Sequence, residues 1–389
     1  MKKQLIITMA GVLVLVGSGQ VMAGMQYTIT DLGTLGGTYS YAYGINASGQ
    51  VVGWSYLTGN SENHAFLYSG GVMQDLGAFG GTVSGTSSGA YGINASGQVV
   101  GYSYLTGHSG SSNAFLYSGG VMQNLGSLDR GYISGASGIN AAGQVVGTAE
   151  TNHNQVNSKW RAFLYSDGVM RDLGTLGGTA SAANGINDSG QVVGDFYTED
   201  YLEHHAFLYS GGAVQDLGTL GGTVSQALGI NAGGQVVGWS YLTGNSAMHA
   251  FLYSGGLMQD MGTLGGAWSR AYGINASGQV VGSSYLTGNS GITHAFLYSD
   301  GVMTDLDSLL PSGWTLLEAQ AINDLGQIVG SGYSPSGDPV AFLLTPVPVP
   351  SAVLLGILGL GTAGWRLRHR TWKERPNKTE TNPPSGIST

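Results

Sequence analysis

Short apolar stretches bounded by glycine-containing turns recur along most of the chain. The first four complete stretches are residues 41–46, 50–56, 64–68 and 72–76. Ala47-Ser48-Gly49 separates the first pair and Ser69-Gly70-Gly71 the last pair, while the middle connection, 57–63, is longer and polar. Glycine supplies the positive φ that tight turns between strands need. The pattern predicts four short strands, with tight turns after the first and the third.

Apolar residues in the second and third predicted strands stand at adjacent positions. Examples are Val51-Val52 in the second strand and Ala65-Phe66-Leu67-Tyr68 in the third. A strand with one face in water alternates apolar and polar residues, whereas a continuous apolar run indicates burial on both faces. These strands are therefore expected to form sheets stacked between neighbouring sheets.

Three markers show that this pattern occurs seven times. Gly-Ile-Asn begins at residues 44, 92, 138, 185, 229 and 273, with Ala321-Ile322-Asn323 as the seventh copy. Ala-Phe-Leu-Tyr begins at residues 65, 114, 162, 206, 250 and 295, with Ala341-Phe342-Leu343-Leu344 as the seventh. Asp-Leu-Gly or a near copy begins at Asp31, Asp75, Asn124, Asp172, Asp216, Asp260 and Asp305. Regular spacing of this kind indicates a repeat array, and we number units one to seven by their Gly-Ile-Asn copy.

The two ends of the array complement each other. Residues 27–33 match a fourth strand with no third strand before it, and residues 341–344 match a third strand with no fourth strand after it. Pairing them removes two open sheet edges. Over residues 24–345 the sequence therefore predicts an all-β fold, a seven-bladed β-propeller of four-stranded blades, closed by pairing of the N-terminal strand with the C-terminal blade. An open solenoid is the alternative, but it gives no reason to divide one unit between the two ends.

An alanine stands two residues before the Gly-Ile-Asn marker in every unit. The copies are Ala42, Ala90, Ala136, Ala183, Ala227, Ala271 and Ala319. Small residues are required where inner strands converge on the axis of a ring. Packing beneath a neighbouring blade is the alternative, and both interpretations fit a propeller.

Residues 1–23 have the order of a secretory signal peptide. Lys2 and Lys3 precede an apolar stretch, and Val21-Met22-Ala23 offers a small-residue cleavage site. We expect export by the Sec machinery and cleavage near Ala23, with a retained membrane helix as the alternative. The chain has no cysteine, which excludes a lipoprotein anchor and a disulfide framework.

A second targeting segment, residues 346–370, follows the repeats. Its proline motif contains Pro348 and Pro350, and its basic cluster contains Arg366, Arg368 and Arg370. The apolar stretch between them is barely long enough to cross a bilayer, with the basic flank expected in the cytoplasm. This order resembles the PEP-CTERM sorting signals of Gram-negative bacteria, in the variant where valine and proline alternate. The resemblance implies processing by an exosortase-like enzyme and a secreted or cell-surface protein that is at least transiently membrane-anchored.

Two features depart from the PEP-CTERM pattern. Val349 stands where the commonest form has glutamate, and a polar tail, residues 371–389, follows where such signals usually end. We expect this tail to be disordered. A plain C-terminal membrane anchor is the alternative.

Charge is distributed unevenly along the chain. The formal net charge is −9, but most basic residues lie in the two terminal segments, so the repeat body carries about −15. A body of this charge repels phosphate backbones, which argues against nucleic-acid partners.

The motif blocks match a known repeat. Asp-Leu-Gly-Thr-Leu-Gly-Gly, Gly-Ile-Asn-x-x-Gly-Gln-Val-Val-Gly and His-Ala-Phe-Leu-Tyr resemble the HAF family of extracellular repeats over residues 27–344. The resemblance implies an exported bacterial protein with this architecture. It implies no defined activity.

Four histidines precede the Ala-Phe-Leu marker. They are His64, His205, His249 and His294, and the same place is taken by Asn113, Arg161 and Pro339 in the other units. Zinc requires three or four ligands about 2.1 Å from one point, whereas equivalent positions in different blades lie far apart. We therefore expect neither a metal site nor a cofactor.

The Asp-Leu-Gly aspartates and the Gly-Ile-Asn asparagines are expected to be turn residues. Asn124 replaces the aspartate in unit two, which keeps a hydrogen-bond acceptor but loses the charge, as a turn cap permits. A calcium site would need several oxygens within one short loop. The Asn-Ala-Ser triplets match a glycosylation pattern, but we interpret them as turns.

Catalytic groups are scarce in this sequence. The acidic cluster in the long loop of unit four contains Glu199, Asp200 and Glu203. It is the sole basis for the alternative of a carbohydrate-active enzyme, and a solvated loop is the simpler interpretation. We predict that the protein is not an enzyme.

One face of the propeller is the best candidate for function. Connections from strand two to strand three and from strand four to the next blade share one rim, and these connections vary between units. The aromatic residues on or beside this variable rim are Tyr56, Tyr104, Trp160, Tyr197, Tyr201, Tyr241, Trp268 and Tyr285. Variable connections on a rigid scaffold are where binding usually resides, and aromatic faces suit stacking on sugars. We expect the rim to bind an exopolysaccharide or an envelope protein, with a structural matrix component lacking a specific ligand as the alternative.

Overall fold

The computed structural model describes residues 26–79, 86–105, 110–129, 131–151, 159–198, 203–288 and 291–347. These residues form 28 β-strands and one short 3-10 helix, η1 (Leu306–Leu309). Residues Gln26–Pro346 make up one compact body. The predicted all-β class is confirmed.

The predicted targeting segments lie outside the described residues. They are the leader with its cleavage site near Ala23 and the sorting signal with Pro348, Pro350, Arg366, Arg368 and Arg370. Over the described ranges, no helix is long and apolar enough to cross a membrane. Both targeting assignments stay predictions.

Units one to six each contribute four strands, and unit seven contributes three. The first strands of units one to seven are β2 (Gly36–Ile45), β6 (Ser88–Ile93), β10 (Ser134–Ile139), β14 (Ala180–Ile186), β18 (Gly221–Ile230), β22 (Gly265–Ile274) and β26 (Thr315–Ile322). The second strands are β3 (Val51–Leu57), β7 (Val99–Tyr104), β11 (Val145–Thr151), β15 (Val192–Tyr197), β19 (Val236–Leu242), β23 (Val280–Leu286) and β27 (Ile328–Tyr333). The third strands are β4 (Asn63–Ser69), β8 (Ser112–Ser118), β12 (Lys159–Ser166), β16 (His204–Ser210), β20 (Met248–Ser254), β24 (Thr293–Ser299) and β28 (Pro339–Val347). The fourth strands of units one to six are β5 (Val72–Gly77), β9 (Val121–Gly126), β13 (Val169–Asp172), β17 (Ala213–Gly218), β21 (Leu257–Asp260) and β25 (Val302–Asp305), and the N-terminal strand is β1 (Gln26–Asp31).

The strands of a unit pair in chain order, antiparallel, as β2 to β5 do. Four sheets have four strands each: β2-β3-β4-β5, β6-β7-β8-β9, β10-β11-β12-β13 and β1-β28-β27-β26. The strands of units four to six form one twelve-stranded sheet, in which single parallel pairs, His204 with Val224 and Met248 with Trp268, join groups of four. β18 and β22 begin at Gly221 and Gly265, within the Thr-Leu-Gly-Gly segments that link one unit to the next.

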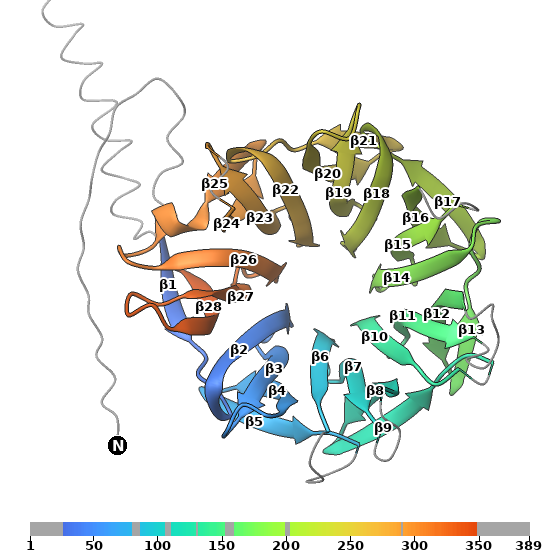
Figure 1. Ribbon diagram of the computed structural model, residues 1–389, viewed down its shortest axis with the longest axis horizontal. Helices are drawn as coiled ribbons and strands as arrows, with labels where there is room; N and C mark the ends of the chain where they lie inside the picture. Colours follow the sequence, from blue (N-terminus) through green and yellow to red (C-terminus); the bar gives the residue numbers. More distant parts are fainter. Residues whose placement is uncertain are drawn as a thin grey trace, which may run out of the picture. The chain divides into compact units, whose positions relative to one another are not determined.

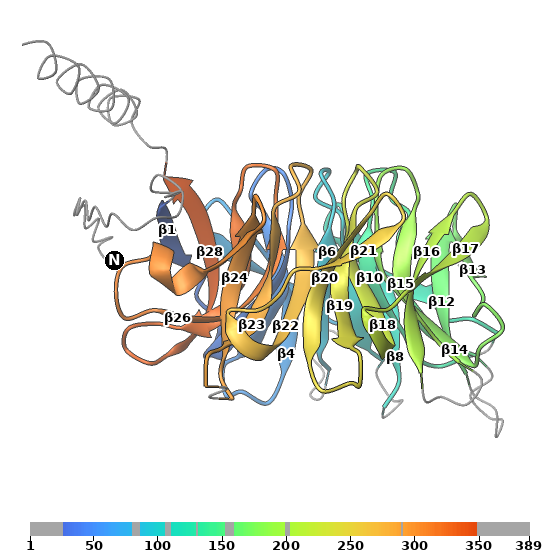
Figure 2. The ribbon, with the colours of Figure 1, turned by 90° about the horizontal axis from the view of Figure 1, so that it is seen from above.

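The sheets are arranged around a common centre, with the first strand of each unit innermost and the fourth outermost (Figure 1). Seen from the side, the connections between strands emerge on two opposite faces of the body (Figure 2). β2 of unit one contacts β27 of unit seven. This is the arrangement of a β-propeller.

The core consists of apolar layers between neighbouring sheets. The layer between units one and two contains Val52, Ala65, Leu76, Ala90, Val99 and Phe115. The equivalent residues between units five and six are Val237, Ala250, Met261, Ala271, Val280 and Phe296. Between the last unit and the first they are Val329, Ala341, Leu32, Ala42, Val51 and Phe66. Six equivalent positions therefore recur, and Leu32 takes at the last junction the place that Leu76 holds at the first.

The recurrent alanines face these layers. All seven are at most 1% exposed, and the alanines of units one to six belong to apolar clusters. Of the two interpretations of alanine, the structure supports packing against a neighbouring sheet.

The N-terminal strand lies at the edge of the last sheet, where β1 follows β28 in the sheet order. The Leu32 amide donates to the Ala341 carbonyl at 3.0 Å. Thr28 Oγ1 donates at 3.3 Å to the carbonyl of Thr345, a residue 317 positions further along the chain. The two ends of the repeat array therefore share one sheet.

The asparagine of each Gly-Ile-Asn marker bonds within its own turn and also to the next unit. In unit one, Asn46 Oδ1 accepts from the amides of Ser48 and Gln50 at 3.1 and 3.0 Å, and Asn46 Nδ2 donates to the Asn94 carbonyl of unit two at 3.1 Å. The same bond to the following unit is made by Asn94, Asn140, Asn187, Asn231 and Asn275. Asn323 of unit seven donates to the Asn46 carbonyl at 3.0 Å, so this asparagine circuit returns to unit one.

We expect Asn46→Asp to destabilise the protein. The carboxylate keeps the acceptors that hold the turn, but the buried Asn94 carbonyl loses its donor from unit one. The free energy of unfolding should fall by about 1–3 kcal/mol, measured by urea denaturation.

Ser48→Ala is the matched control for this turn. Ala142 stands at the equivalent position of unit three, so the repeat tolerates the change, and its effect should be within about 0.5 kcal/mol. Equal stability of Asn46→Asp and the wild type would contradict a role for the circuit.

Candidate functional site

A pocket opens on the variable rim of unit six. Trp268 lies near the start of β22, Tyr285 near the end of β23 and Thr293 at the start of β24, so these three residues gather at the same end of the sheet. Together with Arg270 of β22 and Glu318 of unit seven, they line a cavity of about 130 Å³. We call this cavity the rim pocket.

Two of the predicted rim residues form an aromatic wall of the rim pocket. The rings of Trp268 and Tyr285 stack, with centroids 6.1 Å apart and planes inclined by 30°. Trp268 is 37% exposed, so part of its surface is open to a ligand. A flat apolar surface beside polar groups suits a ligand with one apolar face, such as a sugar ring.

Hydroxyl and carboxylate groups complete the lining. Tyr272 Oη lies 3.2 Å from Ser283 Oγ, and Glu318 Oε2 accepts from Gln320 Nε2 at 2.8 Å. Burial, followed by the nearby Glu318 carboxylate, raises the pKa of Tyr272, so this hydroxyl is neutral at pH 7. The rim pocket therefore offers both donors and a carboxylate acceptor.

Arg270 connects the rim pocket to a polar chain that runs back to unit four. Its guanidinium lies 5.3 Å from the centroid of the Trp239 ring, a cation–π contact. Trp239 Nε1 donates to Gln226 Oε1 at 3.0 Å, and Gln226 Nε2 donates to Asp195 Oδ1 at 2.8 Å. Asp195 is 2% exposed, and His204 Nδ1 lies 3.6 Å from its Oδ2. A buried carboxylate thus orients the groups that hold Arg270 in place.

The other predicted rim residues lie in other units. By ring centroids, Tyr56 is 4.9 Å from Tyr39, Tyr104 is 5.9 Å from Tyr102, Tyr197 is 4.8 Å from His204, and Tyr241 is 5.9 Å from Trp239. Trp160 is 43% exposed, and Tyr201 lies outside the described residues. Among the described members of the set, Trp268 and Tyr285 are the pair whose rings meet.

Arg270, Tyr272 and Glu318 are absent from the rim residues predicted from the sequence. The repeat nevertheless contains a signal for two of them, because the residue just before the recurrent alanine differs widely between units. These residues are Tyr41, Gly89, Gly135, Ala182, Gln226, Arg270 and Glu318. A position that varies inside an otherwise uniform inner strand has a side chain that the common packing does not constrain.

Inner positions that hold aromatic rings in units one and two are mostly polar in units four to seven, where Trp239 and Tyr272 are the aromatic residues among them. Ring centroids are 4.9 Å apart for Tyr41 and Trp54, 5.0 Å for Tyr43 and Tyr91, and 5.8 Å for Tyr91 and Tyr102. Burial raises the pKa of Tyr91. Most polar side chains at these inner positions therefore belong to units four to seven.

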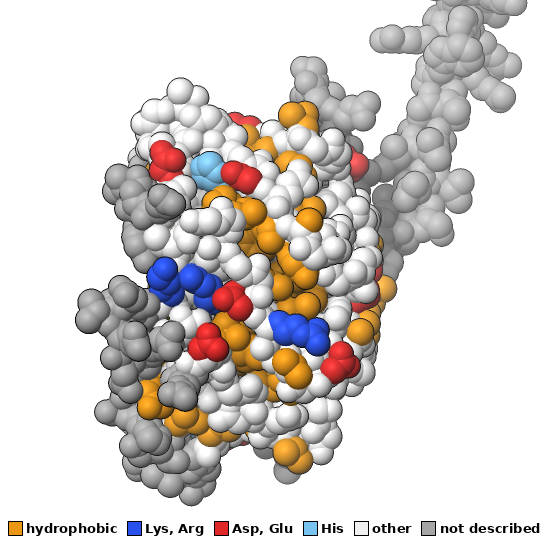
Figure 3. All heavy atoms as spheres, turned by 90° about the vertical axis from the view of Figure 1, so that its right-hand side faces the viewer, with side chains coloured by type: hydrophobic (Ala, Val, Ile, Leu, Met, Phe, Trp, Pro, Cys, Tyr) orange, Lys and Arg blue, Asp and Glu red, His pale blue; other side chains and the backbone are white. Residues whose placement is uncertain are grey.

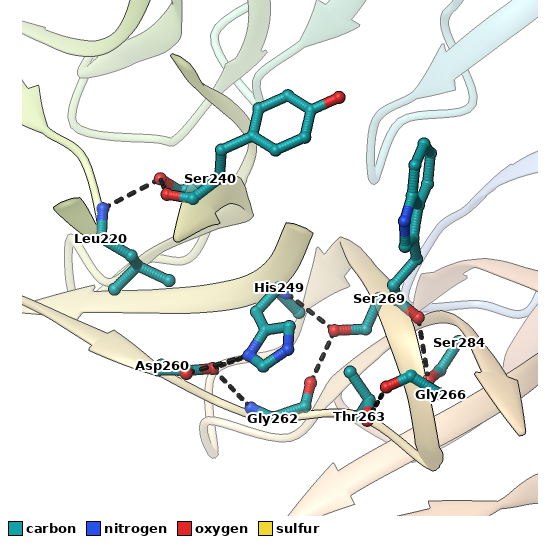
Figure 4. Close-up of polar contacts among 12 residues, drawn as sticks. Leu220, Ser240, His249, Asp260, Gly262, Thr263, Gly266, Ser269 and Ser284 are labelled. Atoms are coloured by element: carbon teal, nitrogen blue, oxygen red, sulfur yellow. Dashed lines mark hydrogen bonds and ion pairs between the residues drawn. The ribbon is translucent and has the colours of Figure 1, made fainter. Parts of the chain in front are cut away.

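The recurrent histidines pair with the Asp-Leu-Gly aspartate of their own unit. In unit five, His249 Nδ1 lies 2.9 Å from Asp260 Oδ1, which also accepts from the Gly262 amide at 2.7 Å (Figure 4). Ser269 of unit six donates to the Gly262 carbonyl at 2.6 Å (Figure 4). The expected capping role of the aspartate is confirmed, and its pairing with histidine is a second role beside it.

The pair is preserved where its members differ. The side-chain amides of Asn113 and Asn124 hydrogen-bond at 3.0 Å in unit two. Arg161 Nε lies 3.5 Å from Asp172 Oδ2 in unit three. Asparagine therefore replaces histidine in the same unit where it replaces aspartate, and the repeated feature is a complementary pair between strands three and four.

Unit six departs from this pattern. Asp307 replaces the glycine of Asp-Leu-Gly, and His294 Nδ1 lies 3.3 Å from Oδ2 of both Asp305 and Asp307. Burial raises the pKa of Asp307 and the Asp305 carboxylate adds to this, against the lowering effects of the Leu316 amide and His294.

The acidic cluster of unit four is described only at Glu203. The backbone carbonyl of Glu203 accepts from the Thr198 amide at 2.9 Å and from its hydroxyl at 3.1 Å. Glu199 and Asp200 lie outside the described residues. The enzyme alternative therefore gains no geometric support from the described part of this loop.

A second cavity, of about 240 Å³, lies among the uniform turns at the centre of the body. Asp188 and Asp324 are among the residues that line it. Asp188 Oδ1 accepts from the Ala141 amide at 2.9 Å, and Asp324 Oδ1 accepts from the Ala276 amide at 2.8 Å. Each carboxylate thus fastens its own turn to the turn of the preceding unit.

Charged side chains are sparse on the outer side of the body where β13 and β17 lie (Figure 3). Figure 3 views the side where β13 and β17 lie and shows separate basic and acidic groups among uncharged atoms and a band of hydrophobic atoms. The described part of this side therefore carries no continuous patch of one sign that would steer a charged polymer.

No protein-family model and no curated protein matches the chain. Among solved structures, the putative TolB from Agrobacterium tumefaciens is 14% identical, with a TM-score of 0.41 over 65% of this chain and 87% of that one. TolB from Acinetobacter baumannii is 10% identical, with a TM-score of 0.39 over 79% and 63%. The β-propeller domain of the Trilobed protease from Pyrococcus furiosus is 9% identical, with a TM-score of 0.49 over 80% and 98%. Similarity at this level carries no information about ligand, activity or location.

The pairing of His64 with Asp75 can be tested by installing the natural pair of unit two. Asp75→Asn alone should lower the free energy of unfolding by about 1–2 kcal/mol, because His64 loses a charged partner. His64→Asn/Asp75→Asn recreates the amide pair, so the double-mutant cycle should show a coupling of about 0.5–3 kcal/mol in its favour. Strictly additive losses in urea denaturation would contradict the pairing.

The same pair gives stability a pH dependence. Burial opposes ionisation of Asp75, but hydrogen bonds from His64 and the Gly77 amide outweigh it, so the pKa of Asp75 lies below its ordinary value of 3.8. Because the pKa is lowered in the folded state, the stabilisation is present above about pH 3.8 and is lost as the pH falls further. His64→Asn/Asp75→Asn should therefore lose less stability than the wild type between about pH 5 and about pH 3. Parallel losses in the two proteins would argue against this origin.

Proposed function

We propose that the protein is an exported, seven-bladed, closed β-propeller that binds an extracellular polysaccharide through its variable rim and has no catalytic activity. The observation that carries the binding function is the rim pocket, where a stacked tryptophan–tyrosine pair lies beside a guanidinium, a carboxylate and a neutral phenol. An apolar wall with a few polar groups is the usual composition of a small-molecule site.

Two features support the closed ring of seven. The asparagine circuit passes through all seven units and returns from Asn323 to Asn46. The apolar layer between units seven and one repeats the six positions of the layer between units one and two. With β1 beside β28, unit seven also has its fourth strand.

Export is supported by the sequence at both ends of the repeat body. The leader with its cleavage site near Ala23 and the segment resembling a PEP-CTERM signal would target the protein to the envelope or the exterior. In that setting the expected partners are the Sec machinery, an exosortase-like enzyme and a polymer of the extracellular matrix.

The size and charge of the site narrow the ligand. A volume of about 130 Å³ is below the roughly 300–1,000 Å³ of pockets for drug-sized ligands, so the rim pocket fits a single sugar ring of a longer chain. Arg270 and Glu318 can bond adjacent hydroxyls, since charged partners make the stronger hydrogen bonds. The acidic body disfavours polyanions, which leaves neutral or amino-bearing polysaccharides.

Trp268→Ala should weaken binding to the neutral exopolysaccharide fraction of the producing organism by about tenfold or more. Aromatic residues that a ligand covers commonly contribute over about 1.4 kcal/mol of binding free energy. Affinity electrophoresis in gels containing the polysaccharide measures the change as lost retardation. Tyr285→Ala should behave in the same way, because it removes the other half of the aromatic wall.

Trp160→Ala is the matched control. Trp160 is an exposed tryptophan of unit three, outside the rim pocket, and its removal should leave retardation unchanged. Equal loss in both tryptophan variants would mean non-specific aromatic adhesion. Absence of retardation in the wild type would reject the binding function in favour of a structural matrix component.

A further inference from the structure

The junction between units six and seven lacks a polar link found at other junctions. Between units five and six, Ser269 Oγ accepts from the Ala250 amide and donates to the Gly262 carbonyl, at 2.8 and 2.6 Å. The serines that make the same two bonds elsewhere are Ser88, Ser134, Ser181 and Ser225. In unit seven Leu316 takes this place opposite Gly332, beside a bulge at Leu317, and neither leucine has a hydroxyl.

An acidic residue enters at the same junction. Asp307 takes the place of the marker glycine, and its Oδ1 accepts from the Leu316 amide of β26 at 2.8 Å. Asp305 Oδ1 accepts from the Asp307 amide at 3.0 Å. Each carboxylate therefore has one oxygen held by a backbone amide, which leaves its Oδ2 for another partner.

His294 Nδ1 faces both of these remaining oxygens. It lies 3.3 Å from Asp305 Oδ2 and 3.3 Å from Asp307 Oδ2. This nitrogen is fully enclosed, yet it has no hydrogen-bond partner. The equivalent nitrogens of His64, His205 and His249 hydrogen-bond to their aspartates at 2.9 Å. In unit six the single short contact of the other units is thus replaced by two longer contacts from one histidine nitrogen.

We propose that His294 Nδ1, Asp305 Oδ2 and Asp307 Oδ2 bind one Zn²⁺ ion, with water as the fourth ligand. The donor atoms of these three residues all lie within 4.8 Å of one another. Ligands of tetrahedral zinc, with bonds of about 2.0–2.2 Å, are separated by about 3.3–3.5 Å, which is the separation of the histidine from each aspartate. The backbone amides on the two Oδ1 atoms supply the outer contacts that orient metal-binding carboxylates.

The donor set favours zinc over the common hard cations. Imidazole nitrogen suits zinc and related transition metals, whereas calcium takes six to eight oxygens. A metal site was not expected from the sequence because histidines of different units do not converge. Here one histidine combines with two carboxylates of its own unit.

The ion would fasten the junction that has no serine link. His294 belongs to β24, Asp305 ends β25, and Asp307 holds the Leu316 amide of β26. Zinc would also neutralise two carboxylates that otherwise repel each other at this point. It is a structural ion in this account, separate from the rim pocket.

Zinc titration of the tag-free mature protein, after treatment with a chelator, tests the proposal by isothermal calorimetry. The wild type should bind one zinc per chain. His294→Gln, and Asp307→Gly, which restores the glycine of the repeat, should each weaken zinc affinity by at least about tenfold. His249→Gln is the matched control, because its unit has the two-residue pair only, and it should bind zinc as the wild type does.

Thermal unfolding gives a second readout. Zinc should raise the melting temperature of the wild type and of His249→Gln, as a ligand of the folded state does, and should leave Asp307→Gly unchanged. Calcium at the same concentration should have no comparable effect. The site would be overturned if the wild type did not bind zinc stoichiometrically. It would also be overturned if His294→Gln bound zinc with wild-type affinity, and this test does not depend on the folding of Asp307→Gly.

Discussion

Each sheet of this protein has two apolar faces, and only a neighbouring sheet can cover each of them. Val51 and Val52 are adjacent in β3 and both fully buried, yet they belong to different layers, one shared with unit seven and the other with unit two. A unit at the end of an open array would leave one such layer in water. The proposed ring removes both exposed faces, and β1 supplies the strand that the last unit lacks.

This constraint fixes most positions of the repeat and leaves a few free to vary. The valines, alanines and phenylalanines of the layers are nearly invariant between units, as are the asparagines of the circuit. Variation is concentrated before the recurrent alanine and in the connections of the variable rim. The rim pocket comes from the first of these, through Arg270 and Glu318, and the proposed zinc site from a change in the Asp-Leu-Gly marker. Both candidate sites therefore lie where a unit departs from its copies.

The sequence was sufficient for the elements of unit one, because strand length and turn chemistry are local properties. The four predicted stretches match β2 to β5, apart from an earlier start of β2 at Gly36. Contacts between units were harder to predict. The bond from Asn46 to Asn94 and the meeting of Trp268 with Glu318 around one pocket depend on how adjacent sheets are staggered. The histidine–aspartate pairs were predictable from the sequence, because in unit two asparagine replaces both the histidine and the aspartate.

Ring closure is the claim on which the rest depends, and native-state hydrogen exchange at residues 27–32 measures it most directly. β1 and β5 hold the same outer position in units seven and one, so a closed ring predicts that the two strands exchange at similar, slow rates. Exchange of residues 27–32 as fast as in a free chain end, with β5 still protected, would contradict the account.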